Sequence, residues 1–561
     1  MRRLDQVLIF SLVFGFLLCL YGLNWGGSHS WHPDEMAFQE IFLPGQLPFN
    51  PKWFHKPPFY TYVNFFLSTL PFFILSKIIP VYADYIELIK VFWSRLLTVF
   101  LFLGSIILVY KITERFFGIF AARVVALVFA TSAGLIAFSH FLTTDIPVTF
   151  WMLVAFYFAQ NIFLGGSQQD YIRAGFFTGI ATATKYNGLA IGITLVVAHI
   201  LSQRDFSWPN LPKKIIFSRQ LYLGLAAVPL GFIVGNPFAI LDYPTFISHF
   251  MYNYIVTPVY DGSTGNSYLK FWLSFVELIG WPSFLLFFSG FGFGFYFLFS
   301  GGKYRQEQKA LILLLSVFFL YYYKFGSFPR LETRFVLPIL PYWMILSGLF
   351  LRLLKPFRIL PISLAVILGY NTICSFYVGK RFVEDPRMVA MEWVKQHIPS
   401  GSSIESTRYS PDWDDIPGVN LQATRIPHQI AVRDKIFESQ FQGNPWVWPI
   451  LKTDIQRSRK AEKWFTLANI QRRNSEYIAI NSLYYNRFFT DSGKKYYPSI
   501  YEYFQKLLAE QLLGYQIVFD GQSQPAPKWI YPQHIDSLEN RMTILRRSPE
   551  TGFLLPGTFD K

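Results

Sequence analysis

The chain has 561 residues, of which 52% are hydrophobic and 15% are charged. Soluble domains carry about 25% charged residues, and the apolar residues here form runs of about 20, the length that crosses a bilayer, so an ordinary soluble protein is excluded. The formal net charge of +15 is spread over short loops between these runs, which disfavours nucleic-acid binding and predicts a membrane topology signal instead.

The positions of the basic residues set the expected topology. Lysine and arginine gather on the cytoplasmic side of membrane proteins, so the basic loops and the N-terminus are expected there. The residues of these loops are Arg2, Arg3, Lys111, Arg115, Arg123, Arg204, Lys213, Lys214, Arg219, Lys303, Arg305, Lys309, Lys355 and Arg358. No small-residue cleavage site follows the first apolar run, which is therefore predicted to remain as a helix.

About eleven transmembrane helices are predicted in chain order. They cover residues 7–23, 92–111, 118–140, 147–164, 172–184, 188–201, 220–236, 276–299, 310–324, 335–353 and 358–378. The stretch 59–80 is also apolar enough to cross, but a crossing there would place every later basic loop outside. We therefore expect it to be interfacial or re-entrant within an extracytoplasmic loop of residues 24–91. Because the predicted number of crossings is odd and the N-terminus is expected in the cytoplasm, the C-terminus is expected on the extracytoplasmic side.

The composition changes near residue 380, which divides the chain into two predicted domains. Residues 1–379 form an α-helical polytopic membrane domain, and residues 380–561 form an extracytoplasmic α/β domain. The elements predicted in the second domain are helices at 388–397 and 499–513 and strands near Ile404, at 477–480 and at 515–519.

Charged motifs fall on the predicted outer side, close to the membrane surface. They are Asp34-Glu35 and Lys56 in the first loop, Asp145 at the start of a helix, and Lys185 between two short helices. A charge at membrane depth costs roughly 2.5–3.5 kcal/mol, so charges kept there tend to be functional. Carboxylates can take a proton and lysines can hold an anion, so the set indicates a catalytic site.

The same residues also have structural interpretations. Acidic residues favour the first turn of a helix, which would account for Asp34-Glu35 and for Asp145. The Lys56 ammonium could extend to the lipid headgroups. We favour the functional interpretation because these charges share one side of the membrane and lie in an aromatic-rich loop and at helix junctions.

Taken in order, these motifs resemble those of the C-type (GT-C) glycosyltransferase superfamily. The resemblance is to the branch that holds protein O-mannosyltransferases and the bacterial transferase that adds aminoarabinose to lipid A. The residues that carry it are Asp34-Glu35 after the first helix, Lys56-Pro57-Pro58, Thr144-Asp145-Ile146-Pro147, Lys185 and Arg334-Phe335-Val336-Leu337-Pro338. A terminal soluble domain adds to the likeness, which extends over nearly the whole chain.

The resemblance implies an inverting transfer of a sugar from a polyprenyl-phosphate carrier to a hydroxyl group of a lipid, glycan or protein. It implies that Asp34 is the general base, that Glu35 positions Asp34 or the acceptor, and that Asp145 is a second essential carboxylate. Lys56 and Lys185 would hold the donor phosphate, with Arg330 or Arg334 assisting. The expected location is a bacterial inner membrane, with the N-terminus cytoplasmic and the C-terminal domain periplasmic.

The sequence leaves metal use and the loop tryptophans open. His55 and His249 are the candidate metal ligands, but no histidine pair has a helical ligand spacing, and a core or interfacial histidine is the favoured reading. Relatives often carry glutamate where this chain has His55, so a divalent metal remains an open cofactor. Trp25, Trp31 and Trp53 fit a sugar platform and a membrane anchor equally well.

Three other functions are compatible with parts of the sequence. An oligosaccharide transferase or ligase would use a pyrophosphate-linked donor and commonly a metal. A transporter or flippase of a lipid-linked or small solute would show two similar halves with broken helices and charges at the membrane midplane, and this chain shows neither. A simple membrane anchor for a binding domain would not need eleven helices with carboxylates on the outer side.

Overall fold

The structure is a computed structural model that describes residues 5–27, 31–35, 47–202, 218–259, 264–299, 305–416, 418–426, 430–535 and 537–548. The basic residues Arg2, Arg3, Arg204, Lys213, Lys214 and Lys303 lie outside these ranges. The chain divides into two compact units. The helical unit contains Met1–Asn24, Asp34–Lys380 and Ala526–His534, and the sheet unit contains Trp25–Pro33, Arg381–Pro525 and Ile535–Lys561.

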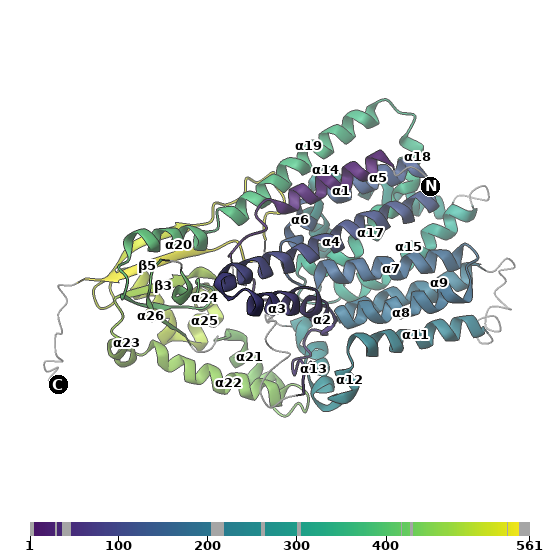
Figure 1. Ribbon diagram of the computed structural model, residues 1–561. Helices are drawn as coiled ribbons and strands as arrows, with labels where there is room; N and C mark the ends of the chain where they lie inside the picture. Colours follow the sequence, from purple (N-terminus) through teal and green to yellow (C-terminus); the bar gives the residue numbers. More distant parts are fainter. Residues whose placement is uncertain are drawn as a thin grey trace. The chain divides into compact units, whose positions relative to one another are not determined.

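The helical unit is a bundle of long apolar helices (Figure 1). Its first half contains α1 (Gln6–Leu20), α2 (Phe59–Asn64), α3 (Leu70–Ile78), α4 (Ala83–Phe117), α5 (Ile119–Ala130), α6 (Ala133–Ser139), α7 (Asp145–Phe163), α8 (Gln168–Thr184) and α9 (Ile193–Ser202). Its second half contains α11 (Arg219–Gly235), α12 (Phe238–Leu241), α13 (Tyr243–Val256), α14 (Tyr268–Phe299), α15 (Arg305–Gly326), α16 (Thr333–Val336), α17 (Leu340–Leu346), α18 (Gly348–Leu354) and α19 (Ile359–Val383).

The chain is an integral membrane protein. Within the described ranges, seven helical stretches are long and apolar enough to cross a membrane, or eight if the bent pair α5–α6 forms one span. Each of the eleven predicted segments contains helix, but α1, α11 and the stretch Tyr186–Ser202 are shorter apolar helices, so the count of eleven is not confirmed. Phe59–Ile78 has the length and composition of a span, and its interfacial position stays a prediction.

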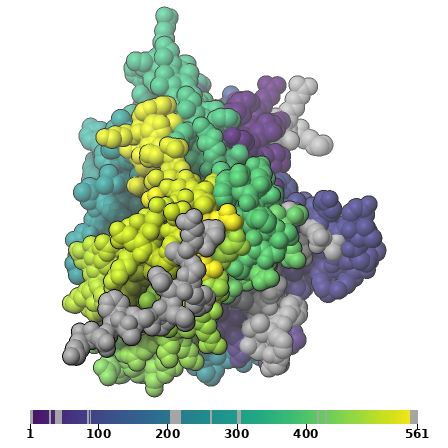
Figure 2. Space-filling model, turned by 90° about the vertical axis from the view of Figure 1, so that its left-hand side faces the viewer, coloured from purple at the N-terminus to yellow at the C-terminus, as the bar shows by residue number. Residues whose placement is uncertain are grey.

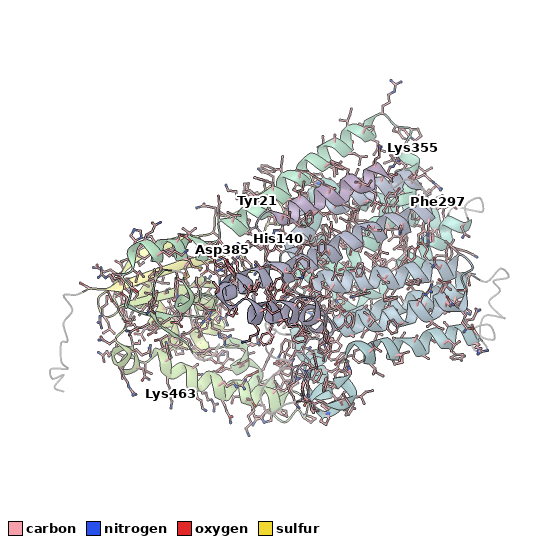
Figure 3. The ribbon with its side chains drawn as sticks, in the orientation of Figure 1. Tyr21, His140, Phe297, Lys355, Asp385 and Lys463 are labelled. Carbon is pink, nitrogen blue, oxygen red and sulfur yellow. The ribbon has the colours of Figure 1, made fainter. Side chains whose placement is uncertain are left out.

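The helix ends assigned to the cytoplasmic side are linked to one another by their charges. Arg123 on α5 binds Asp5, which caps the start of α1, at 2.8 Å. Arg352 on α18 binds Glu307 on α15 at 3.0 Å. Lys355, which follows α18, lies at the same end of the helical unit as the start of α1 (Figures 1 and 3).

Two helices pack unusually closely because glycines line their contact. A Cβ atom on Gly175 of α8 would overlap the backbone of Gly224 on α11, and a Cβ atom on Gly179 would overlap the backbone of Val228. Small residues let helix backbones approach each other in this way. The contact fixes α8, which lies between α7 and α11 (Figure 1) and ends directly before Lys185.

The sheet unit is an α/β domain with one five-stranded sheet of order β2-β1-β3-β5-β4. Its strands are β1 (Ser403–Ser406), β2 (Gln422–Arg425), β3 (Tyr477–Asn481), β4 (Tyr515–Gln522) and β5 (Arg541–Arg547). Its helices are α20 (Pro386–His397), α21 (Val432–Phe441), α22 (Trp448–Glu462), α23 (Leu467–Arg473), α24 (Ser482–Phe489), α25 (Asp491–Tyr496) and α26 (Pro498–Leu508).

Strand β1 is parallel to β2 and β3, and β5 is antiparallel to β3 and β4. In register, Ile404 pairs with Tyr477, and Ile480 pairs with Thr543. Helix α20 packs beside the C-terminal strands, as Figure 2 shows in green and yellow. β3 is buried along its whole length and forms the centre of the core.

Candidate functional site

The loop around Asp34 is held to the helical unit by two cations. The Lys56 ammonium lies 2.8 Å from one Asp34 carboxylate oxygen and also donates to the Asp34 backbone carbonyl at 3.1 Å. The Arg334 guanidinium binds the other carboxylate oxygen. Pro57 and Pro58 restrict the backbone that follows Lys56, directly before α2. The structure therefore brings together three residues that the sequence separates by up to 300 positions.

A second ion pair joins Asp145 to Lys185. Asp145 opens α7, its side chain is only 3% exposed, and one of its oxygens lies 2.5 Å from the Lys185 ammonium. Thr143 donates its hydroxyl to the other oxygen at 3.2 Å. Lys185 has an extended backbone between α8 and the 3₁₀ turn Tyr186–Gly192, so its side chain reaches Asp145 from a helix break.

A third group of charges precedes α16. Glu332 binds Arg330 through one carboxylate oxygen and Arg334 through the other, the latter at 2.5 Å. Sequence analysis singled out both arginines but missed Glu332. The alternation of arginine, glutamate and arginine at positions 330, 332 and 334 was the available signal, because two guanidinium groups so close together need an anion between them.

These three groups form one ionic cluster, defined as Asp34, Lys56, Asp145, Lys185, Arg330, Glu332 and Arg334. Asp145 lies within electrostatic range of Lys56 and Arg334. The ring of Phe335 lies 5.5 Å from the Lys185 ammonium and 5.9 Å from the Arg334 guanidinium. Desolvation lowers the pKa of Lys56, although the neighbouring Asp34 carboxylate partly offsets the shift.

Glu35 lies in a separate buried pair. Its two oxygens accept from Nε and Nη2 of Arg95 on α4 at 3.0 and 3.1 Å, and both side chains are 1% exposed. The Leu142 N–H donates to the same carboxylate at 3.1 Å. Glu35 thus ties the loop that carries Asp34 to α4 and to the segment that leads to Asp145. This geometry fits a positioning residue, and Arg95 is the partner that sequence analysis did not find.

His55 and His249, the two candidate metal ligands, lie against each other. Their rings stack with centroids 4.5 Å apart, and Nδ1 of His249 accepts from the Phe54 N–H at 3.0 Å. Asn253 donates its amide to the His55 carbonyl. Burial lowers the pKa of the His249 imidazole, because desolvation penalises its charged form. In the described part of the chain, no three His, Cys, Asp or Glu side chains are arranged as metal ligands.

The three loop tryptophans have different surroundings. Trp53 is 44% exposed, and its ring lies 5.9 Å from the Lys56 ammonium and 5.3 Å from the ring of His55. Trp25 and Trp31 are buried within the sheet unit and contact each other edge to face. Of the three, Trp53 is therefore the one placed beside the ionic cluster.

One family model matches part of the chain. The model of the dolichyl-phosphate-mannose-protein mannosyltransferase family matches residues 89–231, a range that includes Asp145 and Lys185. No curated protein matches the sequence. The family match agrees with the O-mannosyltransferase branch named above, so the resemblance expected from the motifs is confirmed.

Solved structures share the fold at low sequence identity. ArnT from Cupriavidus metallidurans bound to undecaprenyl phosphate is 16% identical, with a TM-score of 0.52 and 98% of each chain covered. The apo form of the same protein is 15% identical, with a TM-score of 0.50 and the same coverage. An oligosaccharyltransferase from Archaeoglobus fulgidus is 14% identical, with a TM-score of 0.46 over 88% of this chain and 72% of that one. The likeness to ArnT establishes a GT-C-type fold.

Proposed function

We propose that this protein is an inverting glycosyltransferase that moves a sugar from a polyprenyl-phosphate carrier to a hydroxyl group at the outer face of the membrane. The observation that carries the proposal is the Asp34 carboxylate held between Lys56 and Arg334, beside the Asp145–Lys185 pair. Such a site holds a base for the acceptor and cations for a phosphate. The matched family is named for a dolichyl-phosphate sugar, and ArnT was solved with undecaprenyl phosphate.

The proposed reaction is a single displacement. The acceptor hydroxyl oxygen bonds to the anomeric carbon while the bond from that carbon to the phosphate oxygen breaks on the opposite face. The acceptor proton goes to Asp34, and the electron pair of the broken bond stays on the departing polyprenyl phosphate. Lys56, Lys185 and the two arginines stabilise that developing charge. When the phosphate draws Lys56 and Arg334 away from Asp34, the carboxylate oxygens become available to the acceptor.

The charge of the cluster favours a monophosphate donor. Four cations face three carboxylates among the residues of the cluster, which leaves one net positive charge. A sugar on a polyprenyl monophosphate is a phosphodiester with one negative charge and neutralises it. A pyrophosphate-linked donor carries a second negative charge and would need a further cation, commonly a metal. This balance separates the proposed transferase from an oligosaccharide ligase.

The position of the cluster favours an enzyme over a transporter. Asp145 begins α7, Lys185 follows the end of α8, Lys56 precedes α2 and Arg334 lies in the first turn of α16. Charges at helix ends belong at a membrane surface, whereas transporter sites lie near the midplane. A flippase also has no need for a carboxylate held as a base.

The remaining parts of the proposal concern location. The positive-inside pattern supports an N-terminus on the cytoplasmic side and an ionic cluster at the opposite face, and the membrane of the proposal is a bacterial inner membrane. The sheet unit would then lie in the periplasm, where it would help to select the lipid, glycan or protein acceptor. Nucleotide sugars are confined to the cytoplasm, so an enzyme acting outside requires a lipid-carried donor.

The experiment is donor turnover by the purified full-length protein in detergent. A panel of polyprenyl-phosphate sugars is supplied with a cell-envelope acceptor fraction, and released polyprenyl phosphate is measured for wild type and Asp34→Asn, with and without chelator. Asp242→Asn is the matched control, since Asp242 forms a comparable pair with Lys52 at 2.6 Å outside the cluster. Release by wild type and by the control, but not by Asp34→Asn, supports the proposal. Equal release by Asp34→Asn overturns the role of Asp34, and lipid movement without sugar transfer supports a flippase.

A further inference from the structure

Glu332 lies where the proposed donor phosphate would be expected. Its carboxylate contacts Arg330 and Arg334 at the same time, one oxygen to each guanidinium. Arginine guanidinium groups bind carboxylates and phosphates through the same donor geometry. An anion that bridges two arginines therefore occupies the position that a phosphate would take.

The exposure of this group allows exchange. The side chain of Glu332 is 23% exposed, and those of Arg330 and Arg334 are 15% and 18% exposed. The structural Glu35–Arg95 pair, by contrast, is 1% exposed on both sides and also receives the Leu142 N–H. Glu332 lies immediately before α16 with an extended backbone, so its side chain can rotate outward without unwinding a helix.

We propose that Glu332 is an internal competitor of the donor phosphate. It occupies the Arg330–Arg334 pair while the site is empty. The phosphate of the polyprenyl donor takes over the two guanidinium groups, and the Glu332 carboxylate turns outward but stays beside the cluster, so the net charge of the cluster is unchanged. This inference rests on the proposed function and adds a regulation of the same site. After transfer, the free polyprenyl phosphate binds the arginines more strongly than the donor did, because the monoester carries more negative charge. The return of Glu332 to the arginines then promotes release of this product.

A permanent structural role for Glu332 makes the opposite prediction. If Glu332 only orients Arg334 toward Asp34, its loss should disorder the arginine and weaken phosphate binding. If Glu332 competes with phosphate, its neutralisation should strengthen binding. The sign of the change in affinity therefore distinguishes the two roles.

The first experiment measures binding of undecaprenyl phosphate to the full-length protein in detergent, for wild type, Glu332→Gln, Glu332→Asp and Glu307→Gln. Glu307 pairs with Arg352 at the other end of the bundle and is the matched control. Glu332→Gln should bind the lipid phosphate roughly tenfold more tightly, within the usual range for two coupled ligands. Glu332→Asp keeps the charge and should stay nearer to wild type, and Glu307→Gln should not change. Inorganic phosphate is measured in parallel. If the proteins recognise only the phosphate headgroup, inorganic phosphate should bind more weakly than the lipid but rank the four proteins in the same order.

The second experiment uses the wild-type protein and does not depend on the folding of a variant. Carbodiimide labelling of carboxylates, followed by mass spectrometry, should show greater labelling of Glu332 when undecaprenyl phosphate is added. Unchanged or reduced labelling overturns the exchange, as does equal or weaker binding by Glu332→Gln. If wild type binds no polyprenyl phosphate at all, the proposed function fails together with this inference. If wild type binds polyprenyl phosphate and Glu332→Gln binds it no more tightly, only the proposed role of Glu332 fails.

Discussion

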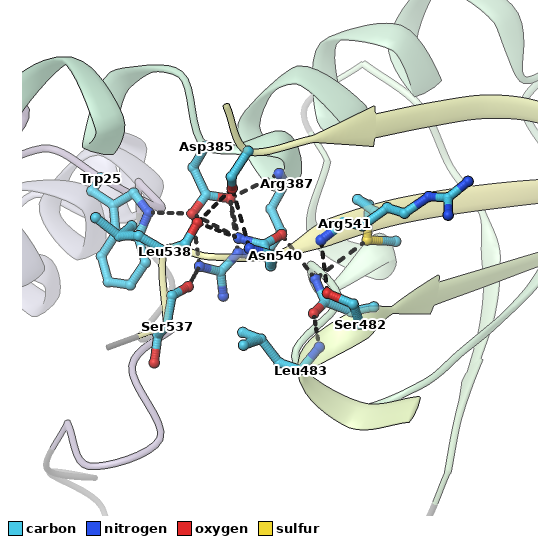
Figure 4. Close-up of polar contacts among 12 residues, drawn as sticks. Trp25, Asp385, Arg387, Ser482, Leu483, Ser537, Leu538, Asn540 and Arg541 are labelled. Atoms are coloured by element: carbon cyan, nitrogen blue, oxygen red, sulfur yellow. Dashed lines mark hydrogen bonds and ion pairs between the residues drawn. The ribbon is translucent and has the colours of Figure 1, made fainter. Parts of the chain in front are cut away.

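Two ionic groups in this protein differ in burial and in how completely their charges are matched. In the sheet unit, Asp385 and Arg387 are both 0% exposed and form a two-point pair at 2.9 and 2.7 Å (Figure 4). Asp385 also accepts from the Trp25 indole N–H at 3.1 Å, and Arg387 donates to the Ser537 carbonyl at 2.6 Å. The ionic cluster of the helical unit is partly exposed instead, with Asp34 at 29% and Lys56 at 23%.

The comparison separates a structural charge from a binding charge. The Asp385–Arg387 pair has one charge of each sign, and the guanidinium lies 5.1 and 4.8 Å from the rings of Trp25 and Trp31. Such a pair has no unbalanced charge to offer a ligand. The ionic cluster has an excess cation and shares its arginines among several carboxylates, so a phosphate can enter by exchange. Trp25 and Trp31 thus act as packing partners of Arg387 rather than as a sugar platform.

The largest expected effect is on turnover. Asp34→Asn keeps the shape of the side chain but removes the base, and general-base catalysis typically contributes about 10²- to 10⁴-fold. Turnover should fall by that factor, while the apparent melting temperature should stay close to wild type because Asp34 is partly exposed. A large loss of melting temperature would mean that Asp34 is a structural charge, like Asp385.

The second effect is on stability. Arg387→Met leaves Asp385 as a buried carboxylate without its cation, and breaking a buried pair costs about 3–5 kcal/mol. The matched control is Arg541→Met, since Arg541 and Asp520 are 38% and 37% exposed and an exposed pair is worth about 0–1 kcal/mol. Thermal unfolding should separate the two variants clearly. Equal melting temperatures would contradict the structural interpretation of Asp385–Arg387.

These residues also show what sequence reasoning could predict. All eleven segments predicted from apolar runs contain helix. Such runs can be recognised from the local sequence, because their length and hydropathy must match the bilayer. The strands at β1, β3 and β4 and the helices α20 and α26 were likewise expected. β2 was missed because its side chains are largely exposed and polar, and β5 was missed because arginines flank its apolar centre.

The site was predictable as a set of residues but not as a set of pairs. Lysines and carboxylates near helix ends pointed to Asp34, Lys56, Asp145 and Lys185 as candidates, and the resemblance to the GT-C superfamily added Arg334. The partners depend on three-dimensional packing, since Arg95 and Glu35 lie 60 positions apart and Arg334 and Asp34 lie 300 apart. The packing of Trp25–Pro33 within the sheet unit likewise has no local signal.

A smaller effect concerns pH and the sheet unit. Burial raises the pKa of Asp434 to about 6, against the partly compensating charge of Arg433 and a hydrogen bond from Ser458. The raised pKa means that the folded state binds the proton more readily than the unfolded state, so stability increases as pH falls through about 6 toward the unfolded value. Asp434→Asn lacks this dependence and should be more stable than wild type at pH 7 by about 1–3 kcal/mol.

The measurement for Asp434 is the melting temperature of the full-length protein from pH 7 to pH 5. Other groups titrate in both proteins, so the informative quantity is the difference between Asp434→Asn and wild type, which should shrink as the pH falls. A constant difference would show that Asp434 is not the group that titrates. Asp412→Asn is the control, because Asp412 is 50% exposed beside Arg425.

The smallest expected effect is that of metal removal, which tests the charge balance of the ionic cluster. Four cations and three carboxylates already match a phosphodiester, and the His249 ring accepts from the Phe54 N–H and stacks on the ring of His55. Turnover of a monophosphate-linked donor should therefore not change when a chelator is added, in wild type or in His249→Gln. If a chelator abolishes turnover and added divalent metal restores it, the donor phosphate needs a cation beyond Lys56, Lys185, Arg330 and Arg334. That result would contradict the charge balance, and a polyprenyl-pyrophosphate sugar added to the panel would then test whether a donor with a second negative charge is turned over faster.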